Sequence, residues 1–164
     1  MLDSPSGSPF NVGVIRKGEP LASPPLTNRE YAYLRITSKD GDHSTVTSQL
    51  GIDPTNAWNA GDMNSGGKRK RKIMSWQYES GLNDRHDIEE HIVELFKVFE
   101  PLSQKLKQLP AEFEICIQCV GYFPPSGHGM HISREFVTKA AEIGASFDLD
   151  FYYVSDNGHD LDYV

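Results

Sequence analysis

Five consecutive cations occupy Lys68–Lys72 (KRKRK), directly before the apolar and aromatic segment Ile73–Tyr78. Along a strand, Arg69 and Arg71 would lie on one face and the lysines on the other, and burying unpaired charges on both faces is too costly. The run therefore predicts the solvated end of a strand, with Ile73–Tyr78 entering the sheet. Two other interpretations stay open: contact with an acidic partner or with the chain's own acidic tail, and nucleic-acid binding. The aromatic residues follow the cations instead of alternating with them, which favours the solvated strand end.

Histidine and aspartate residues offer one candidate metal site. His128 and His131 would diverge along an extended segment unless a turn bends them together. Asp148 and Asp150 share one face of a predicted strand, and they would lie near His131 if the two segments pair. Imidazole and carboxylate groups are ligands of catalytic zinc sites. The set predicts, as an alternative function, a small metal-dependent hydrolase. The competing interpretation is that both aspartates are exposed on an outer sheet face.

Other chemistry-bearing motifs give weaker signals. The sequence contains no G-x-S-x-G and no glycine-rich phosphate-binding motif, and it predicts no cofactor. Cys116 and Cys119 form a C-x-x-C within a predicted strand, where residues three apart point to opposite faces. We therefore expect two reduced thiols and no redox or zinc pair. Trp58 and Trp76 are expected either in the core or at a binding surface, because an indole ring needs cover and its N–H needs an acceptor.

The charge balance indicates the kind of partner. The net charge is −7, and without the five cations of Lys68–Lys72 the chain has 11 basic and 23 acidic residues. Residues 142–164 hold six acidic residues and no Lys or Arg. Such a surface repels phosphate backbones and attracts a basic protein. No apolar run reaches the roughly 18 residues that a membrane helix needs, and the N-terminus does not resemble a secretory signal, so a cytoplasmic location is expected.

Changes in composition predict three regions. Residues 1–28 hold five of the ten prolines and are expected to form a flexible Pro/Ser/Gly-rich extension. Residues 29–154 are expected to form one α+β domain, and residues 155–164 an acidic tail. Alternation predicts a strand at 30–39 with Ala32, Leu34 and Ile36 on one face. A last strand is predicted with inward-facing side chains at Phe147, Leu149, Phe151 and Tyr153.

Helical periodicity and end signals complete the predicted fold. A short helix is expected between Asp42 or Ser44 and Gly51, and another between Ser133 and Gly144. The longest apolar stripe runs from Ile88 to Leu109 and is interrupted at Pro101. These elements predict a four- or five-stranded sheet, mixed or antiparallel, packed by one long and two shorter helices.

Five ordered segments together resemble a known family. They are YAYLRITS, LGIDPTNAWNAGD, MSWQYES, HIVELFKVFEPL and EIGASFDLDFYY. The chain resembles the uncharacterised bacterial family catalogued as domain of unknown function 4279, over about Glu30 to Tyr153. The resemblance implies an α+β domain in a bacterial host, and it carries no catalytic residues over. Some members of that family lie among toxin-immunity genes.

The sequence predicts a non-catalytic cytoplasmic protein that binds another macromolecule, as an immunity or regulatory module. The expected partner is a protein with basic character, since the acidic remainder of the chain would complement it. The residues expected to contribute to binding are Trp58, Trp76, Arg69, Arg71, Asp148 and Asp150.

Overall fold

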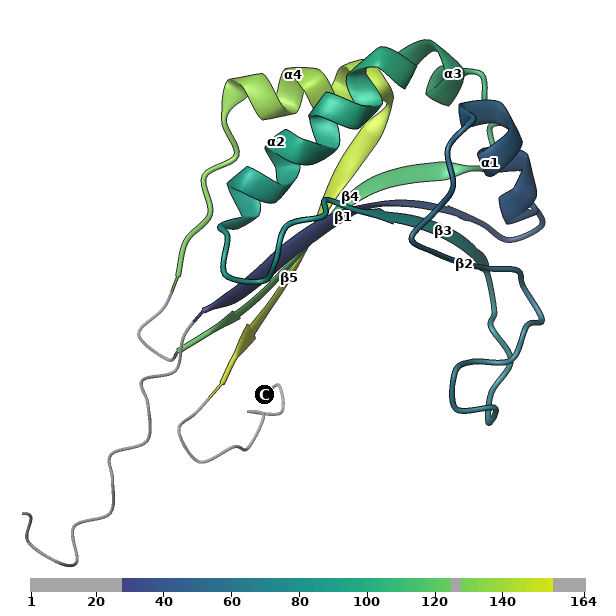
Figure 1. Cartoon of the computed structure of the whole chain (residues 1–164), viewed down its shortest axis with the longest axis horizontal. Coiled ribbons are helices and arrows are strands. Elements are labelled where there is room, and N and C mark those ends of the chain that lie inside the picture. The colour runs from purple at the N-terminus through teal and green to yellow at the C-terminus, as the bar shows by residue number, and fades with distance from the viewer. Residues whose placement is uncertain (1–27, 125–127, 155–164) are drawn as a thin grey trace, which may run out of the picture.

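A computed structural model describes residues 28–124 and 128–154 (Figure 1). The elements follow in the order β1 (Arg29–Ser38), α1 (His43–Leu50), β2 (Asn56–Trp58), β3 (Met74–Glu79), α2 (Ile88–Phe99), η1 (Glu100–Leu102), α3 (Ser103–Lys107), β4 (Glu114–Phe123), α4 (Arg134–Ile143) and β5 (Ala145–Tyr153). The predicted N-terminal extension and acidic tail lie outside the described residues, apart from Asn28.

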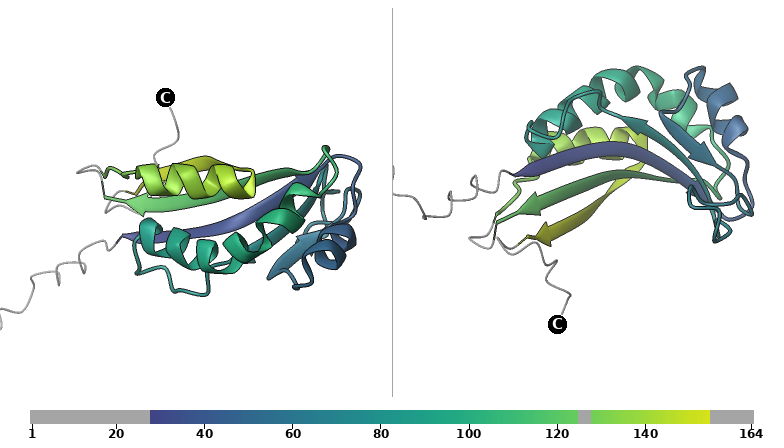
Figure 2. Two further views of the ribbon diagram at one scale, coloured as in Figure 1. Left: turned by 90° about the horizontal axis from the view of Figure 1, so that it is seen from above. Right: turned by 60° about the horizontal axis from the view of Figure 1, so that its bottom comes forward.

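All five strands form one mixed sheet in the order β2-β3-β1-β4-β5, which confirms the predicted α+β class. β1 pairs antiparallel with both β3 and β4, and β2 pairs antiparallel with β3. β5 pairs parallel with β4, which requires the crossover that α4 supplies. The sheet arches, and the helices lie on its convex side (Figures 1 and 2).

The core lies between the convex face of the sheet and the helices. Ala32, Leu34 and Ile36 alternate along β1 and are buried there, as the sequence predicts. The apolar stripe of α2 faces them, and its buried members include Ile92 and Phe96. Burying side chains of this size is the main favourable term in folding, at roughly 1.5–3 kcal/mol for each one.

Helix ends follow the local signals. The side chain of Asp42 accepts from Ser44 N at 2.7 Å, and Gly51 ends α1 with a φ of 76°, a conformation that favours glycine. Asp87 and Glu90 form a capping box at the start of α2. In it, Glu90 Oε2 accepts from Asp87 N at 3.1 Å, and the side chain of Asp87 accepts from the backbone N–H of Glu90. Pro101 lies in the 3₁₀ turn η1, which joins α2 to α3, so the predicted interruption of the long helix is confirmed.

Two expectations about strands need correction. The cations of Lys68–Lys72 do not form a strand end, because β3 begins only at Met74. They belong to a loop in which Lys70 forms an isolated bridge with Met63.

On β5, the predicted inward-facing side chains do share the helix side of the sheet, but the helices cover them incompletely. Leu149 is 42% exposed and Tyr153 is 44% exposed.

The two tryptophans provide a test of this arrangement. Trp76 is fully buried and its Nε1 donates to Thr47 Oγ1 at 3.1 Å, whereas Trp58 is only partly buried at the edge of the sheet. We expect Trp76→Ala to lower the free energy of unfolding by about 3–5 kcal/mol. The matched change Trp58→Ala should lower it by less than about 1.5 kcal/mol. Urea unfolding followed by circular dichroism measures both, and equal losses would contradict the assigned positions.

Candidate functional site

The concave face of the sheet is the candidate site, because no described helix covers it (Figure 2, right). Paired residues project to the same side, so the register identifies its members across the strands. From β2 to β5 they include Trp58, Ser75, Gln77, Tyr31, Tyr33, Arg35, Thr37, Cys116, Gln118, Tyr122, Asp148, Asp150 and Tyr152. Polar and aromatic side chains thus occupy the side of the sheet opposite the core.

A polar cluster links three strands at the centre of this face. Arg35 on β1 reaches across β4, and its Nη2 donates to Asp148 Oδ2 on β5 at 3.1 Å. Gln118 on β4 donates from Nε2 to Asp150 Oδ2 at 3.0 Å. Because Arg35 and Asp148 are both partly solvated, their pair contributes at most about 1 kcal/mol to stability. Its main effect is to hold two charged side chains in fixed positions on an open surface.

This cluster has unused hydrogen-bonding capacity. Gln118 is only 1% exposed although it lies on the uncovered face, since the larger side chains around it exclude water. Within the described part of the chain, neither Gln118 Oε1 nor Arg35 Nε has a hydrogen-bond partner. Buried polar atoms without partners carry a free-energy cost and are uncommon in folded proteins. Both atoms are themselves buried from solvent, so this cost falls on the folded domain itself.

Tyrosines form the end of the concave face near the start of β1. The rings of Tyr122 and Tyr152 stack with centroids 5.0 Å apart, and those of Tyr31 and Tyr33 stack at 6.3 Å. The guanidinium of Arg29 lies 5.6 Å from the Tyr122 ring centroid. Burial, and then the neighbouring Tyr122, raise the pKa of Tyr31 to about 12. Its hydroxyl is therefore neutral at physiological pH, and it interacts with the neighbouring Tyr122.

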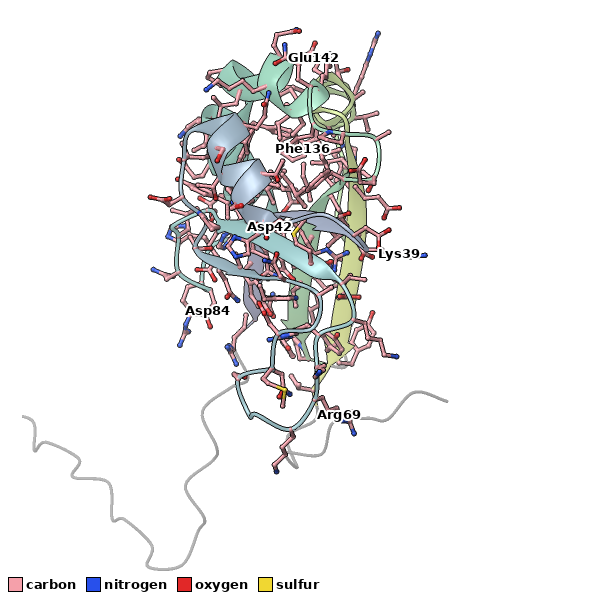
Figure 3. All side chains as sticks on the ribbon, turned by 90° about the vertical axis from the view of Figure 1, so that its right-hand side faces the viewer. Lys39, Asp42, Arg69, Asp84, Phe136 and Glu142 are labelled. Carbon is pink, nitrogen blue, oxygen red and sulfur yellow. The ribbon has the colours of Figure 1, made fainter. Side chains whose placement is uncertain are left out.

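The basic loop, residues 59–73, lies beside the β2 end of this face. Asn64 Oδ1 accepts from Lys68 N at 3.0 Å and from Arg69 N at 3.2 Å, which orders the turn. Arg71 stacks over Trp58 with its guanidinium carbon 4.0 Å from the ring centroid. Figure 3 shows Arg69 at the end of the loop farthest from the helices. The loop thus holds one predicted binding cation against an aromatic ring and presents another to solvent.

A cavity of about 350 Å³ lies where this loop approaches the ends of β1 and β4. Thr37 and Glu114, which pair across β1 and β4, line it together with Ile73 from the loop. Asp40 and Glu112 add further carboxylates, against one cation, Lys39. The cavity is therefore predominantly acidic and suits a basic side chain.

The predicted metal set is wrong, because the sheet separates His128 from the two aspartates. Asp148 and Asp150 project from the concave face. His128 stacks on Phe123, with ring centroids 3.9 Å apart, and its Nε2 lies 3.8 Å from Glu30 Oε2. Phe123 and Glu30 both belong to the opposite face of the sheet. In the described ranges, no group of three or more His, Cys, Asp or Glu residues is placed to hold a metal ion. The aspartates instead bond to protein groups on their own face.

The cysteines diverge as predicted. Cys116 lies on the concave face and Cys119 in the core, and both are free thiols. Burial raises the pKa of Cys116, and it raises that of Cys119 to about 12. Both side chains are therefore protonated thiols at neutral pH, which makes them poor nucleophiles and poor metal ligands.

A second cavity, of about 340 Å³, is lined in part by Ser80 and His91, whose side chains make a partly buried contact that sequence analysis missed. Ser80 Oγ lies 2.5 Å from His91 Nδ1 and also accepts from Leu82 N at 3.2 Å. Nearby, buried Glu30 accepts from Ile88 N, the first amide of α2, at 3.2 Å. These bonds fix the loop between β3 and α2 against the helix start. We assign the cluster a structural role, because both contacts of the Ser80 hydroxyl hold that loop in place.

The model of a family described as a domain of unknown function, DUF4279, matches residues 27–154. The chain belongs to the DUF4279 family. No curated protein and no solved structure matches it. Among the helices that the structure describes in this DUF4279 domain, none is long and apolar enough to cross a membrane.

The six residues predicted to contribute to binding separate into three groups in the DUF4279 domain. Trp58, Asp148 and Asp150 lie on the concave face. Arg69 and Arg71 lie in the adjoining loop. Trp76 is in the core, so it offers no surface to a ligand. Sequence analysis missed Arg35 and Gln118 as site residues, because their position beside the aspartates depends on the strand order.

Thiol reactivity tests the assigned environment of the cysteines. Because burial raises the pKa of both thiols, we expect neither to react within minutes with a disulfide reagent at pH 8 in the folded DUF4279 domain. In guanidinium chloride both should react. Release of the coloured thiolate of the reagent measures the number modified. One rapidly reacting thiol in the native state would show that Cys116 is accessible and ionised.

The pH dependence of stability tests the burial of His91. Burial lowers the pKa of His91 below the usual histidine value of about 6.5, with a smaller contribution from His86. Between the folded and unfolded pKa values the unfolded chain binds more protons, so stability falls as the pH drops below about 6.5. We expect the unfolding temperature of the wild type to fall more between pH 7 and pH 5 than that of His91→Gln. The exposed control His131→Gln should behave like the wild type, and equal falls for all three would refute the assignment.

Proposed function

We propose that this DUF4279 chain is a non-catalytic module that binds a basic protein through the concave face of its sheet. The observation that carries the proposal is the uncovered face itself, where Arg35, Gln118, Asp148 and Asp150 form a polar cluster. A sheet face that neither packs against helices nor binds a partner would need only solvated polar side chains. Here the polar side chains are instead held by bonds across strands and lie among aromatic rings.

Charge complementarity supports a basic partner. Glu112 and Glu114 line the acidic cavity, and Glu114 and Asp150 both project from the concave face. Each could receive a Lys or Arg side chain, and such matched charges raise association rates and exclude wrong partners. The tyrosines beside them supply rigid rings with polar tips, which are frequent in protein interfaces.

The biological role that fits this surface is inhibition or regulation of the bound protein, as in an immunity protein. Complementary charge at a preformed face gives the fast association that an inhibitor of a toxic protein needs. We place this activity in the cytoplasm. Two free cysteines suit a reducing compartment, where disulfides rarely form.

Nucleic acid is the competing ligand. The loop cations and the stack of Arg71 on Trp58 would suit single-stranded nucleic acid. The carboxylates of Glu114, Asp148 and Asp150 on the same face oppose it, because they would repel a phosphate backbone. We therefore favour a protein partner.

Affinity capture with matched variants tests the proposal. The full chain is immobilised and exposed to a nuclease-treated lysate of its native host, as wild type, as Asp148→Asn/Asp150→Asn, and as Glu142→Gln. Glu142 is exposed on α4, on the helix side of the molecule (Figure 3). We expect one basic protein to be recovered stoichiometrically by the wild type and by Glu142→Gln. The double variant should bind it about tenfold more weakly, since charged contacts are lost.

Three results would contradict the proposal. Equal recovery by all variants would place binding elsewhere on the chain. Capture of nucleic acid from an untreated lysate, released by added salt and lost on neutralising the loop cations, would identify the loop as the binding site. Failure to retain any protein at low salt would remove the binding function.

A further inference from the structure

β5 is an open edge of the described sheet. One backbone hydrogen bond shows which of its N–H and C=O groups face β4 and which face outward. Val154 N donates to Phe123 O on β4 at 2.9 Å. In a parallel pair, the N–H and the C=O of one residue both point toward the neighbouring strand, and those of the next residue both point away from it. The backbone groups of Asp148 and Asp150 therefore point toward β4, and those of Leu149 and Phe151 point away from the sheet. No described strand pairs with this outer side.

The side chains of β5 alternate between two chemical types. Asp148 and Asp150 project from the concave face, and Leu149 and Tyr153 project from the convex face. Leu149 and Tyr153 are 42% and 44% exposed. On α4, which packs against β5, Val137 is 54% exposed. The edge thus presents carboxylates on one side and uncovered apolar groups on the other.

The β5 edge lacks lysine, proline and bulges, and the charged side chains that could oppose strand pairing on it are Asp148 and Asp150. Proteins usually shield open edges with lysine, proline, bulges or very short strands. β5 has nine residues, ASFDLDFYY, without lysine or proline, and it pairs in continuous register with β4. The other edge, β2, has three residues and joins the basic loop. Only one of the two edges is therefore suited to strand addition.

We propose that β5 receives an extended segment of the protein partner as a sixth strand, in which basic residues alternate with apolar residues. The basic side chains would lie on the concave face beside Asp148 and Asp150. The apolar ones would cover Leu149 and Tyr153. Backbone hydrogen bonds supply affinity in this mode of recognition, and the alternating side chains supply specificity. The inference rests on the proposed function, since it names the segment by which the basic partner is held.

Charge excludes a second copy of the chain as the occupant. A symmetric pair of β5 strands would run antiparallel and would bring two rows of aspartates onto one face. Like charges opposite each other across strands are destabilising. A segment with lysine or arginine at these positions would instead be attracted. The occupant is therefore a basic heterologous segment.

A designed peptide provides the direct test. The probe is a soluble nine-residue peptide in which lysine alternates with valine, and isothermal titration calorimetry measures its binding to the full chain. A peptide with glutamate in place of lysine should bind at least about tenfold more weakly. N-methylation of those peptide amides that would face β5 should abolish binding, whereas N-methylation of the other amides should leave it intact. Equal effects of the two methylation patterns would overturn strand addition.

Substitution of Leu149 tests the same edge from the protein side. Leu149→Pro removes an N–H that points away from β4, a place where an edge strand tolerates proline. Leu149→Ala is the matched control, because it shortens the side chain and keeps the N–H. We expect Leu149→Pro to bind the peptide at least about tenfold more weakly than Leu149→Ala, with both variants folded by circular dichroism. Equal binding would overturn the inference.

The captured partner separates failure of this inference from failure of the proposed function. If Leu149→Pro retains the partner and Asp148→Asn/Asp150→Asn loses it, the concave face binds the partner without strand addition. If the wild type captures no partner, the proposed function fails and the inference falls with it. A concentration-dependent dimer in sedimentation experiments that Leu149→Pro abolishes would overturn the heterologous partner in favour of a second copy.

Discussion

The central position of β1 is the constraint on which the rest of the structure depends. This strand pairs with β3 from Tyr33 to Ser38 and with β4 from Arg29 to Thr37, so its two faces extend across the sheet. Its alternating side chains place Leu34 and Ile36 on the convex face and Tyr33 and Arg35 on the concave face. The helices pack where the apolar side chains are, because burying that area stabilises the fold. The opposite face is consequently left for polar contacts.

Polar side chains on the concave face are ordered because they bond across strands. Arg35 and Asp148 are 113 residues apart in sequence, and only the strand order β1-β4-β5 brings them within 3.1 Å. A fixed charge pair loses less conformational entropy on binding than two mobile side chains would. Preorganisation of this kind is consistent with the proposed recognition of a partner.

The two edges of the sheet differ in a way that follows from their connections. β2 joins the ordered basic loop, where Arg71 packs on Trp58, and this loop occupies the end of the concave face. β5 follows α4 directly after Gly144, whose φ of 74° ends the helix and turns the chain into the strand. Among the described residues no strand pairs with the outer side of β5, so the backbone groups on that side are not used in the sheet.

Local sequence determined the elements of this protein, and tertiary structure decided the site. The alternation of β1, the caps of α1 and the break at Pro101 depend on neighbours a few residues apart, so their signals are legible in the sequence. Strand order is not encoded in such local signals. It placed Asp148 and Asp150 beside Arg35 and Gln118 and away from His128, which is why the predicted metal set failed. The cations of Lys68–Lys72 form a loop because bonds to Asn64 close the turn there, a contact that strand periodicity does not reveal.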